Sequence, residues 1–206
     1  MTAYLSGLML GFALIVPIGP QNIVVLNQGL TIRFPKSLFA AVFAGLCDTL
    51  LIVTGAVGVG ALLAGIPALR SLLLAVGAVF LLYLALGSCR RSTTDMPAVG
   101  EGCALPQVAA KIAGASLLNP HAILDTVVVI GATIAAQRDD VRLLFAGGTL
   151  SASWLWFAFL VLAAGAIRRY LTPSSRAWLD RVSGATLVLF AGMLALECAH
   201  SVMTGR

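Results

Sequence analysis

The chain has 206 residues, of which 60% are hydrophobic and 10% are charged, and its formal net charge is +5. Soluble domains contain roughly 45–50% apolar and about 25% charged residues, so this composition excludes an ordinary soluble domain and indicates an integral membrane protein. The basic residues lie in short connections rather than in a tail or along one helix face. Nucleic-acid binding is therefore not expected, because orientation by the membrane accounts for the positive charge more simply.

Charged residues divide the chain into six apolar segments, predicted at 3–30, 37–64, 67–89, 107–136, 141–167 and 179–202. Each is long enough to cross a bilayer as a helix, for which about 20 apolar residues suffice. The first segment carries no charge between Met1 and Arg33, and as one straight helix it would exceed the roughly 30 Å hydrocarbon core. It must therefore tilt, break or re-enter the membrane. The sequence thus predicts an all-α polytopic membrane protein with six transmembrane helices.

The connection between the third and fourth segments is the most loop-like part of the chain, being rich in Gly, Pro and Thr. We expect a single transmembrane domain over 1–206, made of a first three-helix repeat (1–89), a linker (90–106) and a second three-helix repeat (107–206). Because three is odd, the second half would be inverted relative to the first, as in many transporters. Chance similarity between glycine-rich apolar segments is the alternative.

The positions of Lys and Arg predict the orientation of the chain, since these residues are enriched in cytoplasmic loops. Nine of them lie in the first, third and fifth connections, whereas four lie in the second and fourth connections and at the C-terminus. This distribution predicts that both termini are outside. If the first segment re-enters the membrane, the N-terminus would instead be cytoplasmic.

Two prolines that lie 100 residues apart interrupt apolar segments, Pro20 after Gly19 and Pro120 after Asn119. Proline disrupts a helix interior by about 3 kcal/mol or more, but it is favoured as a first helical residue, and Asn is a favoured N-cap. We therefore expect the first and fourth helices to be broken, with a half-helix beginning at each proline. Paired breaks indicate a substrate site at the membrane midplane. Proline kinks that serve only packing are the alternative.

Two aspartates lie within apolar segments, Asp48 in the second and Asp125 in the fourth. Neither shares its membrane span with a Lys or Arg, because Lys111 is counted with the loop that precedes the fourth span. Carboxylates in a membrane usually face a polar interior and mark a pathway. Protonation, a bound cation or a water-filled cavity would satisfy them. Helix N-termini bind carboxylates, so the breaks and the aspartates together suit a zwitterion with a cationic side chain. A protonated aspartate that joins two helices is the alternative.

Other polar or small residues in the segments allow two interpretations each. His121 is a packing residue or a proton carrier, and Ser151 and Ser153 either line a cavity or join helices. Gly7 and Gly11 permit close helix approach, which leaves a homodimer open without establishing one. No Cys or His cluster has metal-ligand spacing, so neither a metal site nor a cofactor is expected.

These motifs together resemble the lysine exporter (LysE) superfamily, and specifically its branch of basic amino-acid exporters, over nearly the whole chain. The most specific part is Pro17-Ile18-Gly19-Pro20-Gln21-Asn22, which is followed by Asn27-Gln28-Gly29. The Gly-Pro-Gln-Asn form, rather than Pro-Gly-Pro-Asn, favours this branch over the homoserine and threonine exporters. Similar motifs surround Asp48, the second break, and the stretch from Gly148 to Trp156.

The resemblance implies a multi-pass protein of a bacterial-type cytoplasmic membrane, not an enzyme, that exports L-lysine or L-arginine by means of the proton motive force. Its partners would be the substrate, protons and membrane lipid. It also implies that Asp48 and Asp125 are the acidic pair of the family. Substrate binding is expected at Pro20, Gln21, Asn22, Asp48, Asn119, Pro120, Asp125 and Ser151. Proton coupling is expected at Asp48, Asp125 and His121.

Two other functions stay open on the sequence alone. The first is export of neutral amino acids or small cations, which other members of the superfamily carry out. Metal transport is disfavoured because no Cys/His cluster accompanies the two aspartates. The second is an intramembrane hydrolase in which Ser151 or Ser153 acts as a nucleophile with His121 as its base. No Gly-x-Ser-x-Gly motif surrounds either serine, which makes the hydrolase a distant alternative.

Overall fold

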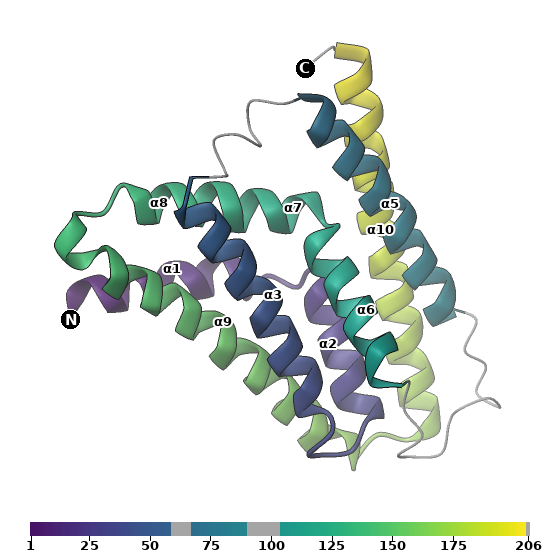
Figure 1. Ribbon diagram of the computed structural model, residues 1–206. Coiled ribbons are helices and arrows are strands. Elements are labelled where there is room, and N and C mark those ends of the chain that lie inside the picture. The colour runs from purple at the N-terminus through teal and green to yellow at the C-terminus, as the bar shows by residue number, and fades with distance from the viewer. Residues whose placement is uncertain (59–66, 90–103, 205–206) are drawn as a thin grey trace.

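The computed structural model describes residues 1–58, 67–89 and 104–204, and the regular structure in these ranges is helical, as the sequence predicts (Figure 1). The helices are α1 (Thr2–Ile15), α2 (Pro20–Thr31), α3 (Leu38–Ala56), α5 (Pro67–Cys89), α6 (Leu105–Leu117), α7 (Pro120–Ile123), the π-helix η1 (Leu124–Ile130), α8 (Gly131–Ala135), α9 (Asp139–Arg168) and α10 (Pro173–Thr204). Helices satisfy their own backbone hydrogen bonds, which is what an apolar surrounding requires.

Three stretches of the described chain are long and apolar enough to cross a membrane, namely α3, α9 and the part of α10 over Arg181–His200. The pair α1 and α2 would supply a fourth, since it meets the same criteria together and is bent by 84° at its break. This bend fits either a broken span or a re-entrant loop. The helical membrane architecture is therefore confirmed, whereas six spans and an inverted repeat remain predictions.

Both predicted helix breaks are present. The helix α2 begins at Pro20, with Gly19 as its extended N-cap residue, and α7 begins at Pro120 after a two-residue interruption. The second half-helix continues from α7 through η1 and α8, so Asp125 lies in a π-helical turn rather than in an ordinary α-helix. Local rules for prolines at helix starts were sufficient to locate both positions.

The described part of the second apolar segment, predicted at 37–64, contains one helix, α3. The helix α3 stops at Ala56, although the apolar composition continues to residue 64. Gly58 follows with φ of 97°, a left-handed conformation that favours glycine and commonly ends helices. Residues 59–66 and most of the predicted linker lie outside the described residues.

Glycines bring α1 and α9 into close contact along their length. An added Cβ at Gly7 would overlap the backbone of Phe145, and one at Gly148 would overlap the backbone of Tyr4 and Leu8. Gly11 of α1 faces Thr149 and Ala152 of α9. The glycine face that left a homodimer open in the sequence is therefore packed against α9 of the same chain.

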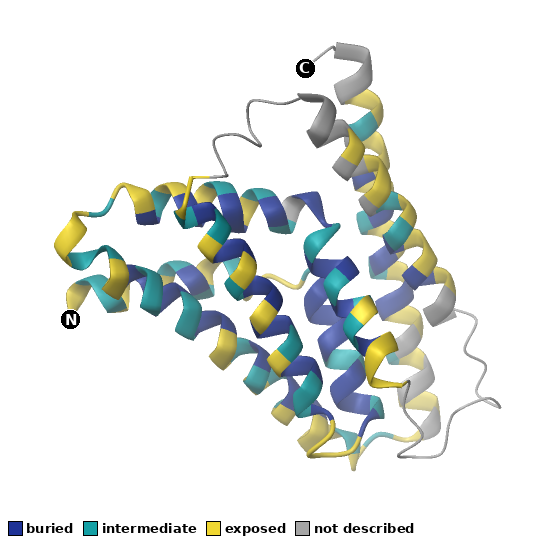
Figure 2. Ribbon diagram, in the orientation of Figure 1, coloured by how far each residue is buried: buried dark blue, intermediate teal, exposed yellow. Residues whose placement is uncertain are grey.

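The helix α2 lies in the middle of the molecule and is buried along most of its length, although it is among the more polar helices (Figure 2). The helices α3, α6 and α9 surround it, while α5 and α10 run side by side as a separate pair (Figure 1). Polar residues at the start of α2 therefore face protein rather than lipid. This arrangement places the first break between α3, the second break and α10.

Candidate functional site

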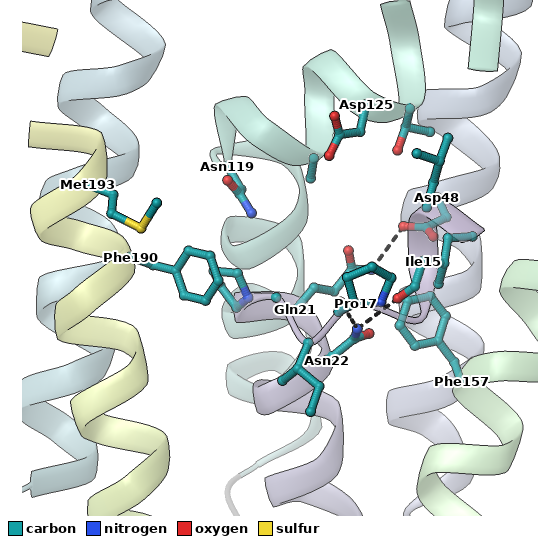
Figure 3. A pocket seen from close by; sticks show the side chains of 16 residues that line it. Ile15, Pro17, Gln21, Asn22, Asp48, Asn119, Asp125, Phe157, Phe190 and Met193 are labelled. Carbon is teal, nitrogen blue, oxygen red and sulfur yellow. Dashed lines mark hydrogen bonds between the residues drawn. The ribbon is translucent and has the colours of Figure 1, made fainter. Parts of the chain in front are cut away.

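A cavity of about 290 Å³ lies at the first helix break. This volume is near the lower end of the roughly 300–1,000 Å³ that small-molecule sites occupy, so the cavity suits a ligand of amino-acid size. Figure 3 shows it between the break, the second half-helix and α10. Its lining consists of Leu14, Ile15, Pro17, Ile18, Gly19, Pro20, Gln21, Asn22, Asp48, Asn119, Ala122, Asp125, Thr126, Phe157, Phe190 and Met193.

The lining of the cavity mixes polar and apolar side chains. Phe190 and Met193 from α10 lie on the same side as Asn119, whereas Phe157 from α9 lies on the side of Asp48 (Figure 3). Nothing in the sequence pattern singled out these three apolar residues, because similar side chains recur throughout the apolar segments. A ligand with both charged groups and methylene groups would be complementary to this lining.

Asp48 is a buried carboxylate whose two oxygens are both hydrogen-bonded. Its side chain accepts from Gln21 Nε2 at Oδ1 over 3.0 Å and from Ser153 Oγ at Oδ2 over 2.9 Å. These partners come from α2 and α9, so the carboxylate of α3 joins three helices. Buried charges require such partners, since an isolated one would be very costly.

Asp125 differs from Asp48 because it is exposed to the cavity. It lies in the π-helix η1, and within the part of the chain that the structure describes, no hydrogen bond or ion pair reaches its carboxylate. Figure 3 shows it on the side of the cavity opposite the first break. A cation that entered the cavity would find the oxygens of Asp125 available.

The side chain of Asn22 forms hydrogen bonds with the backbone at the first break. Its Nδ2 donates to the carbonyls of Ile15 and Pro17, both at 2.9 Å, and its Oδ1 accepts from Trp156 Nε1 at 3.2 Å. Breaking a helix frees carbonyl groups, which must find other donors in an apolar surrounding. The amide of Asn22 supplies these donors, so its side chain already serves the break itself.

Two of the predicted residues, Pro120 and Ser151, are not among the described residues that line the cavity. Pro120 is buried at the start of α7, and the half-buried Ser151 donates to the carbonyl of Gly147 at 2.8 Å. The side chain of His121 lies outside the described residues. The other predicted substrate residues, from Pro20 to Asp125, all contact the cavity.

The sequence allows Ser153 either to line a cavity or to join helices, and the predicted substrate site includes Ser151 but not Ser153. Ser153 is fully buried and bonded to Asp48, whereas Ser151 is bonded within its own helix. Residues two apart point to different faces of a helix, so one of the two serines had to face away from α3. Only the rotation of α9 about its axis decides which one.

Broken helices that enclose a cavity with two carboxylates define this chain as a helical membrane protein with a polar site at a helix break. The family comparison is more specific. The chain belongs to the LysE type translocator family, whose model matches residues 12–198.

Curated relatives are similar over nearly their full length. The chain is 37% identical over 205 residues to the arginine exporter protein ArgO of Enterobacter sp. (strain 638), with 97% of this chain and 96% of that protein covered. It is 38% identical over 205 residues to ArgO of Shigella flexneri, with 96% of each covered. It is 34% identical over 200 residues to YisU of Bacillus subtilis (strain 168), named as an inferred amino-acid transporter, with 96% and 90% covered. No solved structure matches the chain.

Proposed function

We propose that this chain exports basic L-amino acids, arginine and lysine, from the cytoplasm in exchange for protons. The name of the ArgO relatives supports export of arginine, and membership of the translocator family supports transport as the class of activity. The observation that carries the proposal is that one cavity contains both a helix start and two carboxylates.

The helix start would bind the α-carboxylate of the substrate. The first N–H groups of a helix have no partner within the helix and carry partial positive charge. In α2 these groups belong to Gln21 and Asn22, because Pro20 has no N–H. Anions bind such ends readily. Asn119, which lies across the cavity, would complete this half of the site.

The aspartates would bind the cationic side chain or the α-ammonium group. Asp125 is available to the cavity, and Asp48 lies deeper, where Gln21 and Ser153 hold it. Protonation from outside would discharge the acidic half and release the substrate. As the sequence predicts, His121 would take part in proton coupling, and Pro120 and Ser151 would take part in substrate binding.

The membrane potential sets a condition on coupling. An interior-negative potential opposes export of a cation by about 2.3 kcal/mol per charge per 100 mV. Exchange for one proton is electroneutral and uses the pH gradient alone. Exchange for more than one proton would also use the potential, and two carboxylates provide two proton sites.

The site would reach the two sides of the membrane in alternation. We propose six spans in two inverted halves, 1–89 and 107–206, in a bacterial-type cytoplasmic membrane with both termini outside. The two predicted half-helix starts would then approach the midplane from opposite sides.

Counterflow of radiolabelled arginine in vesicles that contain the purified protein tests the proposal. Lysine should compete with arginine. Citrulline, which has no side-chain cation, and agmatine, which has no carboxylate, should each compete weakly, because each lacks the group that one half of the site binds. An outward-directed arginine flux should rise when the opposite compartment is made acidic.

Protein-free vesicles and vesicles with Asp48→Asn and Asp125→Asn variants are the controls. Normal arginine export by both variants would contradict the acidic half of the site. Equal competition by agmatine and arginine would contradict the carboxylate half.

A further inference from the structure

The two oxygens of Asp48 have chemically different partners. Oδ1 accepts from the amide nitrogen of Gln21 at 3.0 Å, and Oδ2 accepts from the hydroxyl of Ser153 at 2.9 Å. All three side chains are buried, and Gln21 and Asp48 also line the cavity. The difference determines which oxygen can take a proton without losing a hydrogen bond.

An amide NH₂ group donates only, whereas a hydroxyl group both donates and accepts. A proton on Oδ1 would face the N–H of Gln21, and two hydrogens would meet. A proton on Oδ2 would face Ser153 Oγ, which can accept it once the serine hydroxyl has rotated. The hydrogen bond between Asp48 and Ser153 then persists with its direction reversed.

Helix geometry offers the rotated hydroxyl a second acceptor. Serine in a helix can donate to the carbonyl four residues earlier, which for Ser153 is the carbonyl of Thr149. Ser151 already makes this kind of bond, to Gly147 at 2.8 Å. Both protonation states of Asp48 can therefore leave the hydroxyl of Ser153 fully hydrogen-bonded.

We infer that Ser153 is a positioning residue for proton coupling, which directs the transported proton to Oδ2 of Asp48. This inference rests on the proposed function, in which protons drive export. When the proton binds Oδ2, the hydroxyl of Ser153 turns to donate to the carbonyl of Thr149. When the proton leaves, the hydroxyl turns back and donates to Oδ2 again. No other bond forms or breaks.

Among the side chains that the structure describes, few other titratable groups face Asp48, and the side chain of His121 on α7 lies outside that part of the chain. Cys47, the neighbour of Asp48, lies on the same helix, and η1 contributes Asp125, which lines the same cavity. The helices α2 and α8 carry no titratable residue, and α9 carries its charges near its two ends. Lys111 of α6 does not line the cavity. Asp125 is therefore the carboxylate whose charge most directly affects proton binding at Asp48.

Infrared difference spectroscopy of the purified protein across pH tests the proton site without any substrate. One component of the protonated-carboxyl band that appears on acidification should be lost in Asp48→Asn, which assigns it to Asp48. This component should move to higher frequency in Ser153→Ala because the acid loses its acceptor. Ser153→Thr should restore the wild-type band. An unchanged band in Ser153→Ala, or no band that depends on Asp48, overturns the inference.

Transport in vesicles gives the second readout. In Ser153→Ala, the stimulation of arginine flux by a pH gradient should fall roughly tenfold relative to counterflow, the effect of losing one hydrogen bond to a charged group. Ser153→Thr should recover it. Ser116→Ala is the matched control, because Ser116 is an equally buried serine. Among the described residues, its hydroxyl has no hydrogen-bond partner and Ser116 is not part of the cavity lining.

The outcomes separate the two proposals. Equal loss of counterflow and of gradient-driven flux in Ser153→Ala would indicate a structural role and overturn the inference, as would wild-type stimulation. If the wild-type protein shows no arginine counterflow, the proposed function fails, while the infrared series still decides whether Ser153 directs a proton to Asp48.

Discussion

The two helix breaks begin from similar sequences but serve different purposes. At the first break the chain bends by 84°, and the amide of Asn22 donates to the carbonyls of Ile15 and Pro17. At the second break only Leu118 and Asn119 separate two helices, and the π-helix that follows presents Asp125 to the cavity. Polar residues near a break are thus not equally available to a ligand. The first break uses its polar side chains to repair the backbone and hold Asp48, while the second leaves a carboxylate open.

Replacing the open carboxylate should have the largest effect. Asp125→Asn should weaken arginine binding roughly 100-fold, since loss of one partner of a desolvated charge pair costs about 3 kcal/mol. Titration calorimetry on the purified protein measures this, and Asp125→Glu should retain part of the affinity. Thermal unfolding of the same samples should change little, because no hydrogen bond or ion pair reaches this carboxylate in the described chain. If Asp125→Asn binds arginine with wild-type affinity, the carboxylate at the second break does not bind the ligand, and the two breaks do not differ in this respect.

Changing the first break should instead reduce stability. Asn22→Asp removes the donors to two carbonyls and should lower the free energy of unfolding by roughly 3 kcal/mol, since each unsatisfied buried group costs about 1–3 kcal/mol. Chemical unfolding in detergent measures the loss. Trp156→Phe removes the hydrogen bond that Trp156 Nε1 donates to Asn22 Oδ1 and should cost about 1 kcal/mol. Equal losses of stability in the two variants would mean that the hydrogen bonds from Asn22 to the two carbonyls do not stabilise the break.

The second half-helix depends on close packing against α3. An added Cβ at Gly55 would lie 2.5 Å from the carbonyl oxygen of Val127 in η1, so Gly55→Ala should displace the π-helix. We expect a loss of about 1–3 kcal/mol in stability together with weaker arginine binding. Gly147→Ala is the control, because nothing lies within 4 Å of its Cβ position and alanine favours helices. Tolerance of Gly55→Ala would show that Asp125 does not depend on this contact.

The smallest effect is expected just before the second break. The hydroxyl of Ser116 is fully buried on α6, and no residue in the described part of the chain forms a hydrogen bond with it. Ser116→Ala should therefore be neutral or stabilise the fold by up to about 1 kcal/mol, since it removes an unsatisfied polar group. A clear loss of stability in the same unfolding assay would indicate that this serine makes a contact after all.

Much of the architecture was predictable from local rules. The start of α2 at Pro20 and the start of α7 at Pro120 follow from proline's missing N–H and its fixed φ. The end of α3 at Ala56 could not be predicted, because apolar composition does not reveal that Gly58 adopts a left-handed conformation. Most predicted substrate residues contact one cavity, since charged and polar groups in an apolar chain avoid lipid.

The sequence by itself determined that this is a helical membrane chain, where its helices break and which two carboxylates need a polar surrounding. These properties depend on composition and on near neighbours. The tertiary structure alone decided that Ser153 rather than Ser151 meets Asp48, that Asn22 bonds the carbonyls of the break, and that Phe190 lines the cavity. The physical reason is that the rotation of a helix about its axis depends on its packing partners, and some of these lie more than 100 residues away, such as Gly7 against Phe145.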